Sequence, residues 1–180
     1  MTTTTLSRAV LEKYPNSIFV ETGTFWGDAV QLALDCGFET IFTIELNPKL
    51  AENTRKRFHK EIAQGRVGVL EGDSFELFPK LVAELAAPTT FWLDAHWDGG
   101  PVGRYKCPLP MELEALLAHP IRNHTLLIDD RRIMGQANSN WGANVYEADV
   151  RATIMQINPD YVISYEPGWI PDDIIAAVVR

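Results

Sequence analysis

The sequence predicts an α/β fold, a doubly wound and mostly parallel sheet that ends in an antiparallel hairpin. Strand-like segments alternate with helical segments through most of the chain. The strand-like segments are almost continuously apolar, as expected for strands covered by helices on both faces. No internal repeat or linker interrupts the 180 residues, which suit one domain spanning 1–180. Right-handed crossovers then make the doubly wound form the economical topology.

Five strands and five helices are expected before the hairpin. The strands are expected at 17–21, 40–46, 66–70, 89–94 and 125–129, and the helices at 28–36, from 48 onward, at 74–85, 111–118 and 147–157. Asn47 followed by Pro48 is a typical helix start, and Asp73 or Ser74 can cap the third helix. The segments 161–165 and 174–179 are too close for a helix between them, so they should pair antiparallel.

Composition excludes several functional classes. The formal charge of -8 argues against a nucleic-acid partner. The basic run Arg55 to Arg57 shares its helix with acidic residues, so it should be a solvated face. Cys36 and Cys107 form no CxxC pair, which favours a reducing compartment without a disulfide scaffold or zinc site. No signal peptide and no membrane-length apolar run is visible, so we expect a cytoplasmic protein without a membrane partner.

Acidic residues mark the ends of the predicted strands. In a doubly wound sheet, ligands bind beyond the carboxyl ends of the strands, near the switch point of strand order. Chance would scatter acidic residues over loops and helix faces. Instead, one closes or follows each of the five strands: Glu21, Glu45, Asp73, Asp94 and the pair Asp129-Asp130. We therefore expect a ligand site at this edge of the sheet.

The turn after the first strand has the form ExGxxxG, from Glu21 to Gly27. Gly23 allows a tight turn, and Gly27 allows close contact at the next helix. A dinucleotide site would favour GxGxxG, with an open helix N-terminus for the pyrophosphate. A carboxylate beside bulky Phe25 suits a cationic group better, such as the amino group of S-adenosylmethionine. The alternative is a glycine turn needed only for packing.

The second and third strand ends suit a nucleoside. Glu45 can accept hydrogen bonds from both ribose hydroxyls, although the same acid could simply favour a helix N-terminus. Asp73 and Ser74 could meet the adenine, or they could serve as a helix cap. Both roles are compatible.

Four motifs together resemble the class I (Rossmann-like) S-adenosylmethionine-dependent methyltransferases. These motifs are VETGTFWG, TIELNP, EGDS and FWLDAHW, and the resemblance runs from about Ser17 to Val179, closing hairpin included. It implies methyl transfer from S-adenosylmethionine, with Asp94 beside the reacting methyl group. The implied cofactor-binding residues are Glu21, Thr22, Gly23, Thr24, Phe25, Gly27, Glu45, Asp73, Ser74 and Asp94.

One branch of that family looks closer than the rest. The runs LDAHW at 93–97 and LIDD at 127–130 resemble the magnesium-dependent O-methyltransferases of the catechol and antibiotic-sugar tailoring types. The resemblance implies that Asp94, Asp129 and Asp130 hold Mg²⁺, which would activate a substrate hydroxyl. Alternatively, only Asp94 contacts a ligand and the Asp129-Asp130 pair caps the next loop. The two catalytic candidates are Asp94 and His96. His96 is either a general base or a residue that orients Asp94 through a hydrogen bond.

Two loops on the same edge should bind a small polar acceptor. They span 97–110 and 131–146, and their polar and aromatic residues suit a hydroxylated metabolite. Cys107 lies in a proline-rich segment and should be structural. The acceptor candidates are His96, Trp97, Arg104, Tyr105, Arg131 and Trp141.

Two features leave alternatives open. Few residues precede the first strand, so either the acceptor pocket is open or a second copy closes it, and we expect a homo-oligomer. Some relatives of this branch are hydroxylases, so a tailoring enzyme of that kind is one alternative. A non-catalytic protein with the same fold is another, although such a protein has no reason to keep mutually repelling buried carboxylates.

Overall fold

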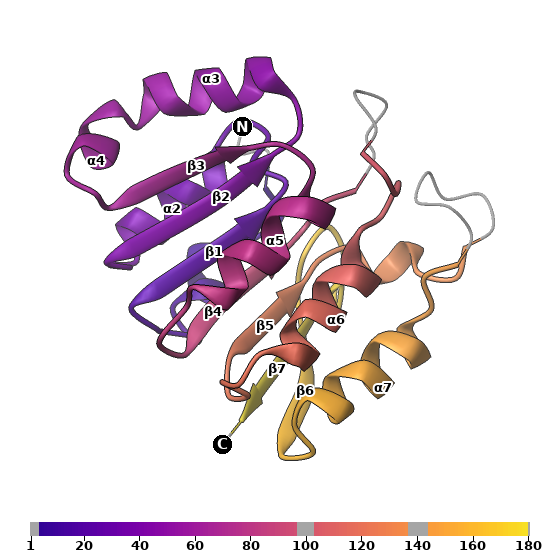
Figure 1. Cartoon of the computed structure of the whole chain (residues 1–180). Helices are drawn as coiled ribbons and strands as arrows, with labels where there is room; N and C mark the ends of the chain where they lie inside the picture. The colour runs from indigo at the N-terminus through magenta and orange to yellow at the C-terminus, as the bar shows by residue number, and fades with distance from the viewer. Residues whose placement is uncertain (1–3, 97–102, 137–143, 180) are drawn as a thin grey trace.

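The computed structural model describes residues 4–96, 103–136 and 144–179. They form a seven-stranded sheet in the order β3-β2-β1-β4-β5-β7-β6 (Figure 1). β1 to β5 pair in parallel, whereas β7 pairs antiparallel with both β5 and β6. The strands are β1 (Ile18–Thr22), β2 (Thr40–Glu45), β3 (Val67–Glu71), β4 (Thr89–Leu93), β5 (Thr125–Ile128), β6 (Tyr161–Glu166) and β7 (Ile174–Val179).

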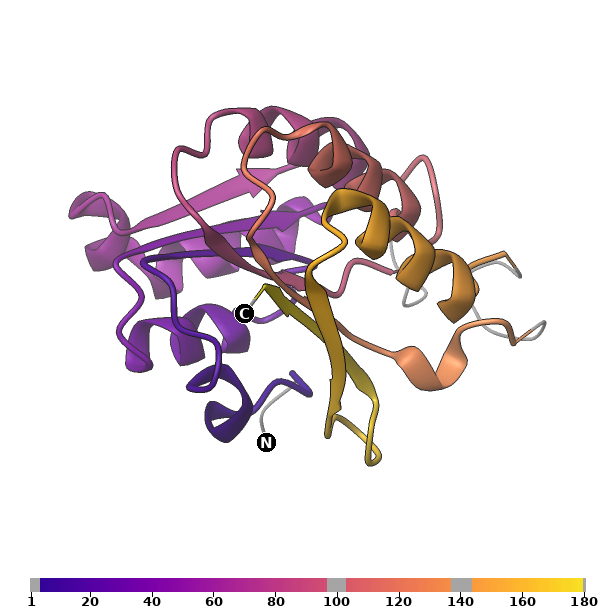
Figure 2. The ribbon, with the colours of Figure 1, turned by 90° about the horizontal axis from the view of Figure 1, so that it is seen from below.

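Helices cover both faces of the sheet (Figures 1 and 2). One face carries α5, α6 and α7, and the other carries α1 and α2. The helices are α1 (Arg8–Leu11), α2 (Asp28–Asp35), α3 (Pro48–Arg57), α4 (His59–Ala63), α5 (Ser74–Ala83), α6 (Leu109–Ala118) and α7 (Glu147–Ile157), with the 3₁₀ turn η1 (Arg131–Ile133). No helix in the described part of the chain is long and apolar enough to span a membrane.

The alternation of side chains along the strands divides the core into two halves. Phe19 and Trp92 pack with α1 and α2, whereas their chain neighbours Val20 and Phe91 pack with α5 and α6. All four side chains are fully buried. Successive strand residues point to opposite faces, so a strand covered on both sides must be apolar at every position. The burial of both faces therefore explains why the predicted strands are apolar at nearly every position.

The predicted doubly wound sheet and its closing hairpin are confirmed. The helix over 147–157 and the last strand have the predicted bounds, and α3 begins at Pro48 behind an Asn47 cap. Three short elements were not predicted: α1, α4 and η1. Each spans at most 5 residues, too few to show a helical period. α6 also begins earlier than expected, at Leu109, because Pro110 is tolerated in its first turn.

The structure also bears on two expectations from composition, for the basic run 55–57 and for the two cysteines. The basic run on α3 is a surface face, with Lys56 paired to Glu52 at 3.2 Å and Arg55 to Glu71 at 2.7 Å. Cys36 and Cys107 are free cysteines. Cys107 is buried, and burial raises the pKa of its thiol to about 12, which agrees with a structural role.

Candidate active site

A cavity of about 330 Å³ lies over the carboxyl ends of the parallel strands. The strand-end acids Glu45, Asp73, Asp94, Asp129 and Asp130 all line it, so five of the six predicted strand-end acids meet in one space. The chain brings them together because parallel strands end at the same edge of the sheet. The other lining residues are Thr5, Gly23, Phe25, Ile44, Leu46, Asn47, Leu50, Gly72, Ser74, Ala95, His96, Gly103, Tyr105, Lys106, Pro108, Arg132 and Trp169.

Glu45, at the end of β2, is held firmly in the cavity wall. Its Oε2 atom accepts a hydrogen bond from the backbone N–H of Phe25 at 2.8 Å, and its Oε1 atom accepts one from that of Asn47 at 2.8 Å. The side chain is only 7% exposed. Each carboxylate oxygen can accept a second hydrogen bond. The carboxylate is therefore oriented in advance for a ligand with two adjacent hydroxyl groups.

Asp73 serves as the helix cap that the sequence allowed. Its Oδ1 atom accepts a hydrogen bond from the backbone N–H of Phe75 at the start of α5, at 3.0 Å. Its Oδ2 atom accepts another from the backbone N–H of Arg104, at 2.5 Å. Asp73 therefore connects α5 to the segment that precedes α6. Ser74 lies beside it in the cavity wall, and a role for either residue at adenine stays a prediction.

Glu21 lies outside the cavity lining. It is 2% exposed and accepts a hydrogen bond from Thr43 at 2.6 Å, and burial raises the pKa of its carboxyl to about 8. Two neighbours in the predicted cofactor set, Thr22 and Thr24, are also buried away from the lining. Thr24 hydrogen-bonds to Thr43. These threonines and Glu21 form the packed layer beneath the turn.

The glycines of the first turn have packing reasons. Gly23 has φ 85°, and a Cβ atom there would lie 2.7 Å from the carbonyl oxygen of Asp94. This close approach of the β1 and β4 ends requires glycine. Gly27 lies against the ring of Phe58, outside the cavity lining. Phe25, between them, lines the cavity and is 39% exposed.

Three carboxylates meet where β4 and β5 end. Burial, together with the negative charges of Asp129 and Asp130, raises the pKa of Asp94 well above its ordinary value. Burial and the neighbouring Asp130 raise the pKa of Asp129 to about 6. The Oδ2 atom of Asp129 accepts a hydrogen bond from Thr5 at 2.5 Å, whereas its buried Oδ1 atom has no partner among the described residues. The cluster has an excess of negative charge.

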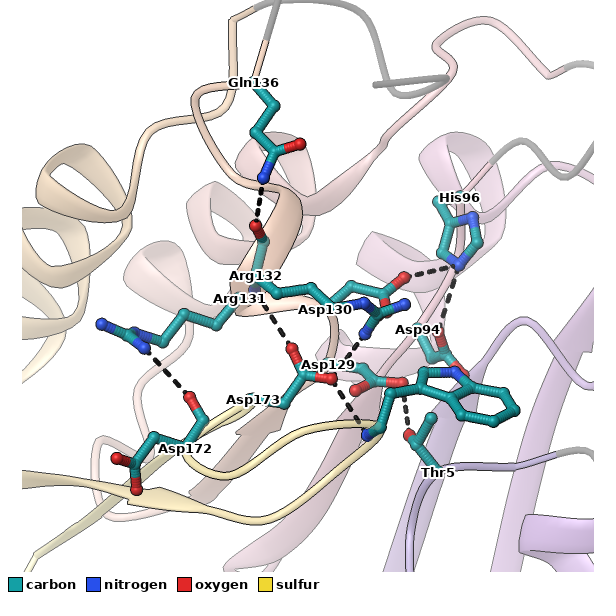
Figure 3. Close-up of polar contacts among 11 residues, drawn as sticks. Thr5, Asp94, His96, Asp129, Asp130, Arg131, Arg132, Gln136, Asp172 and Asp173 are labelled. Carbon is teal, nitrogen blue, oxygen red and sulfur yellow. Dashed lines mark hydrogen bonds and ion pairs between the residues drawn. The ribbon is translucent and has the colours of Figure 1, made fainter. Parts of the chain in front are cut away.

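Asp130 differs from the other two because a histidine and an arginine contact its carboxylate (Figure 3). Its Oδ2 atom lies 2.9 Å from the Nε2 atom of His96, and its Oδ1 atom is paired with Arg132. Although burial opposes the shift, these two partners hold the pKa of Asp130 below its ordinary value. Asp130 also has φ 61°, a left-handed conformation that few residues other than glycine adopt. Such strained residues gather at functional sites.

Two groups of side chains have the geometry to hold a metal ion. One consists of Asp94, His96 and Asp130, and the other of Asp129, Asp130 and Asp173. Asp130 belongs to both. The predicted triad Asp94, Asp129 and Asp130 is thus divided between two overlapping groups. His96 lies 3.6 Å from the nearest oxygen of Asp94, so the hydrogen bond that the sequence suggested to Asp94 is made to Asp130 instead.

The structure separates the predicted acceptor residues. Tyr105 lines the cavity, whereas Arg104 lies over the ring of Phe75 at 4.7 Å, outside the lining. Arg131 also points elsewhere: it binds Glu147 at 2.9 Å and lies over the ring of Tyr165 at 4.4 Å. Its chain neighbour Arg132 lines the cavity in its place. Trp97 and Trp141 lie outside the described residues.

Sequence reasoning missed four residues at or beside the β5 side of the cavity. They come from three places in the chain: Thr5 from the N-terminal segment, Arg132 from η1, and Trp169 and Asp173 from the hairpin. Asp173 is fully buried and accepts hydrogen bonds from the backbone and side chain of Arg132. One signal could have found the hairpin residues. A strand parallel to β5 must end at the cavity edge, so the loop that follows it emerges there.

Several solved structures have a fold similar to that of this chain. An O-methyltransferase from Bacillus cereus, in complex with S-adenosylhomocysteine, is 17% identical and has a TM-score of 0.65, over 96% of this chain and 78% of that one. The fold is that of the class I O-methyltransferases. TomG, an O-methyltransferase of tomaymycin synthesis from Streptomyces achromogenes in complex with S-adenosylmethionine, is 16% identical, with a TM-score of 0.62 over 96% of this chain and 77% of that one.

A methyltransferase from Podospora anserina bound to S-adenosylhomocysteine has the same fold. It is 15% identical, with a TM-score of 0.59 over 91% of this chain and 72% of that one. No protein-family model matches the sequence, and no curated protein matches it either. The methyltransferase fold is therefore established here by architecture, and the chemistry has to be argued from the cavity.

Proposed function

We propose that the protein is an S-adenosylmethionine-dependent methyltransferase that methylates a hydroxyl group of a small polar metabolite with the help of Mg²⁺. One observation carries the proposal. A single cavity has an oriented carboxylate for a ribose at one end and a cluster of carboxylates at the other, with Asp94 between them. The fold supports it, because similar structures hold S-adenosylmethionine or its product in complex.

The donor half of the cavity suits an adenosyl group. Both oxygens of Glu45 are fixed by backbone N–H groups and can each accept a ribose hydroxyl. Ser74 and Asp73 lie farther along, where the adenine would bind. In this arrangement the sulfonium lies toward Asp94, whose negative surroundings favour a cation. The donor would thus be bound by charge at one end and by hydrogen bonds at the other.

The acceptor half suits a hard divalent cation. The buried Oδ1 atom of Asp129 has no partner among the described residues, and burial and then the nearby carboxylates raise the pKa of its neighbour Asp94. Both features indicate that Arg132 alone does not balance the negative charge of the cluster. Asp129 and Asp130, which share one of the two groups, would hold Mg²⁺ with Asp94 beside them, because the ion prefers carboxylate oxygens. Bound there, the ion would lower the pKa of a substrate hydroxyl.

The remaining demands on the protein are modest. The acceptor oxygen forms a bond to the methyl carbon, the carbon–sulfur bond breaks, and its electron pair stays on sulfur as S-adenosylhomocysteine leaves. The hydroxyl proton goes to a base, either His96 or water. Alignment of oxygen, carbon and sulfur can supply roughly 7–11 kcal/mol of the barrier. The protein would supply that alignment by holding the donor inside the cavity and the acceptor at its mouth.

Calorimetry with S-adenosylhomocysteine tests the donor site. Glu45→Gln should weaken binding about ten- to a hundredfold, because hydrogen bonds to a charged group are worth about 1.5–3 kcal/mol. Glu39→Gln, at an exposed position before β2, is the matched control and should bind normally. Absence of measurable binding to the wild-type protein would overturn the proposal. Release of S-adenosylhomocysteine with a methylated product, rather than an oxidised one, would establish the reaction class.

A homo-oligomer is also proposed, in which a second copy would cover the mouth of the cavity. Light scattering on the purified protein measures the mass directly, and a monomer of 20.2 kDa would contradict this expectation.

A further inference from the structure

The loop between β6 and β7 (167–173) reaches the cavity from the far end of the sheet. β6 and β5 both pair antiparallel with β7, so β6 runs in the direction of β5 and ends at the cavity edge. Trp169 of this loop lines the cavity. In the strand order, the loop lies on the side of Asp129 and Asp130, away from Glu45. The indole therefore belongs to the acceptor half.

The backbone of this loop is tied to the carboxylate cluster. The buried Oδ2 atom of Asp173 accepts hydrogen bonds from the backbone N–H of Trp169 at 3.1 Å and from the side chain of Arg132 at 2.5 Å. Arg132 in turn pairs with Asp130 (Figure 3). The backbone N–H of Arg131 donates to the carbonyl of Asp173 at 2.8 Å. The position of Trp169 is thus fixed relative to Asp130.

The indole ring itself is unusually open. Trp169 is 70% exposed, more than any other large hydrophobic residue that the structure describes. Its exposure does not result from a loosely held backbone, because the hydrogen bond to Asp173 holds the residue in place. An exposed aromatic face at a cavity mouth gains free energy when a ligand covers it. The cavity of about 330 Å³ is at the lower end for ligand sites, so a donor inside it leaves the acceptor at this mouth.

We propose that Trp169 is the acceptor-binding residue of the site, and that the ring of a small neutral acceptor stacks on its indole while a ring hydroxyl points to the carboxylate cluster. This inference rests on the proposed function. The flat indole face fits a ring with an apolar face, and the carboxylates of Asp129 and Asp130 repel an anionic acceptor. A phenolic ring and a pyranose share this chemistry.

Fluorine NMR of protein labelled with 5-fluorotryptophan tests the inference directly. The chain has five tryptophans, and Trp169→Phe assigns the resonance of Trp169 by removing it. Catechol and methyl β-glucopyranoside are the two probes, each added with S-adenosylhomocysteine and Mg²⁺ present. A saturable shift of the Trp169 resonance with catechol indicates a phenolic acceptor, and one with the glucoside indicates a pyranose. Trp26, 48% exposed but outside the cavity lining, is the internal reference and should not move.

Two variants separate stacking from a structural effect. Trp169→Ala should weaken binding of the active probe about fivefold or more, whereas Trp169→Phe should retain most of the affinity because it keeps an aromatic face. Both should bind S-adenosylhomocysteine as the wild type does, since the ring is exposed and remote from Glu45. Equal loss of probe and S-adenosylhomocysteine affinity in Trp169→Ala would overturn the inference.

Failure of the inference and failure of the proposed function give different results. If calorimetry shows that the protein binds S-adenosylhomocysteine but neither probe moves the Trp169 resonance, the acceptor role of Trp169 is wrong and the proposed function stands. If S-adenosylhomocysteine does not bind at all, both fall.

Discussion

The Nε2 atom of His96 lies 2.9 Å from the Oδ2 atom of Asp130, so the imidazole joins the segment after β4 to the end of β5. A side chain held in this way orients the carboxylate that it contacts. Of the two roles expected for His96, orientation of a neighbouring carboxylate therefore has a contact in the structure, although the carboxylate is that of Asp130. The role of general base needs a substrate proton within hydrogen-bond reach of the imidazole.

Replacement of His96 distinguishes these two roles. If the residue orients Asp130, His96→Ala should weaken Mg²⁺ affinity about tenfold or more in the presence of S-adenosylhomocysteine, as loss of groups that orient metal ligands usually does. Isothermal titration measures this. His59→Ala, at an exposed histidine on α4, should leave the affinity unchanged. Unchanged Mg²⁺ affinity in His96→Ala, with a lost acidic limb in the pH profile of kcat, would indicate a general base instead.

The cation site can be tested through stability. Mg²⁺ binds only the folded protein in our proposal, so it should raise the melting temperature of the wild type in a concentration-dependent way. In Asp129→Asn that increase should disappear, because the buried Oδ1 and Oδ2 atoms no longer carry a full charge. Asp160→Asn, at an exposed aspartate before β6, should respond to Mg²⁺ as the wild type does. Identical Mg²⁺-dependent increases in all three proteins would contradict the site.

Gly23 and Gly65 separate backbone strain from a steric clash. Both have positive φ, 85° and 73°, but only at Gly23 would a Cβ atom meet another group within 4 Å, the carbonyl of Asp94 at 2.7 Å. Gly65→Ala should therefore cost only about 1 kcal/mol of unfolding free energy. Gly23→Ala should cost roughly 3 kcal/mol or more and should also weaken S-adenosylhomocysteine binding, because the ends of β1 and β4 must separate. Urea denaturation and calorimetry measure the two effects, and equal costs would refute the clash.

The sequence predicts the half of the site that depends on local pattern. Apolar runs locate the parallel strands, and the acids at their ends, such as Glu45 and Asp94, follow directly. Whether a particular acid faces the ligand depends on packing beneath the turn, and Glu21 is instead buried against Thr43. The hydrophobic pattern does not predict which way a strand-end side chain points, because a shift of one residue along the strand turns it from the cavity to the core.

The acceptor half depends on contacts distant in sequence. Thr5 reaches Asp129 across 124 positions, and the contact between Arg132 and Asp173 spans 41. No local periodicity encodes such pairs. Residue type does not distinguish Arg131 from Arg132, because either arginine suits a cavity-lining position. Only the course of η1 directs Arg132 to the cavity. Long-range contacts of this kind require the strand order β5-β7-β6 to be known first.

Glu112 on α6 predicts a pH dependence of stability. It is 2% exposed, and burial raises the pKa of its carboxyl from 4.5 to about 8. The folded state therefore holds a proton that the unfolded chain releases above pH 4.5. The resulting stability is fully present below that pH and is lost as the pH rises toward 8, with a slope of at most about 1.4 kcal/mol per pH unit.

Glu112→Gln removes this proton linkage while preserving the shape of the side chain. At pH 5 the variant and the wild type should unfold with similar free energies, because both side chains are neutral. At pH 7 the variant should have gained about 2–3 kcal/mol relative to the wild type. Glu114→Gln, on the exposed face of the same helix, should follow the wild type throughout. Glu21, whose pKa is also raised to about 8, contributes equally to all three proteins and cancels in the comparison. Urea denaturation at the two pH values gives the difference, and a gain that does not depend on pH would show that Glu112 is already ionised in the folded protein.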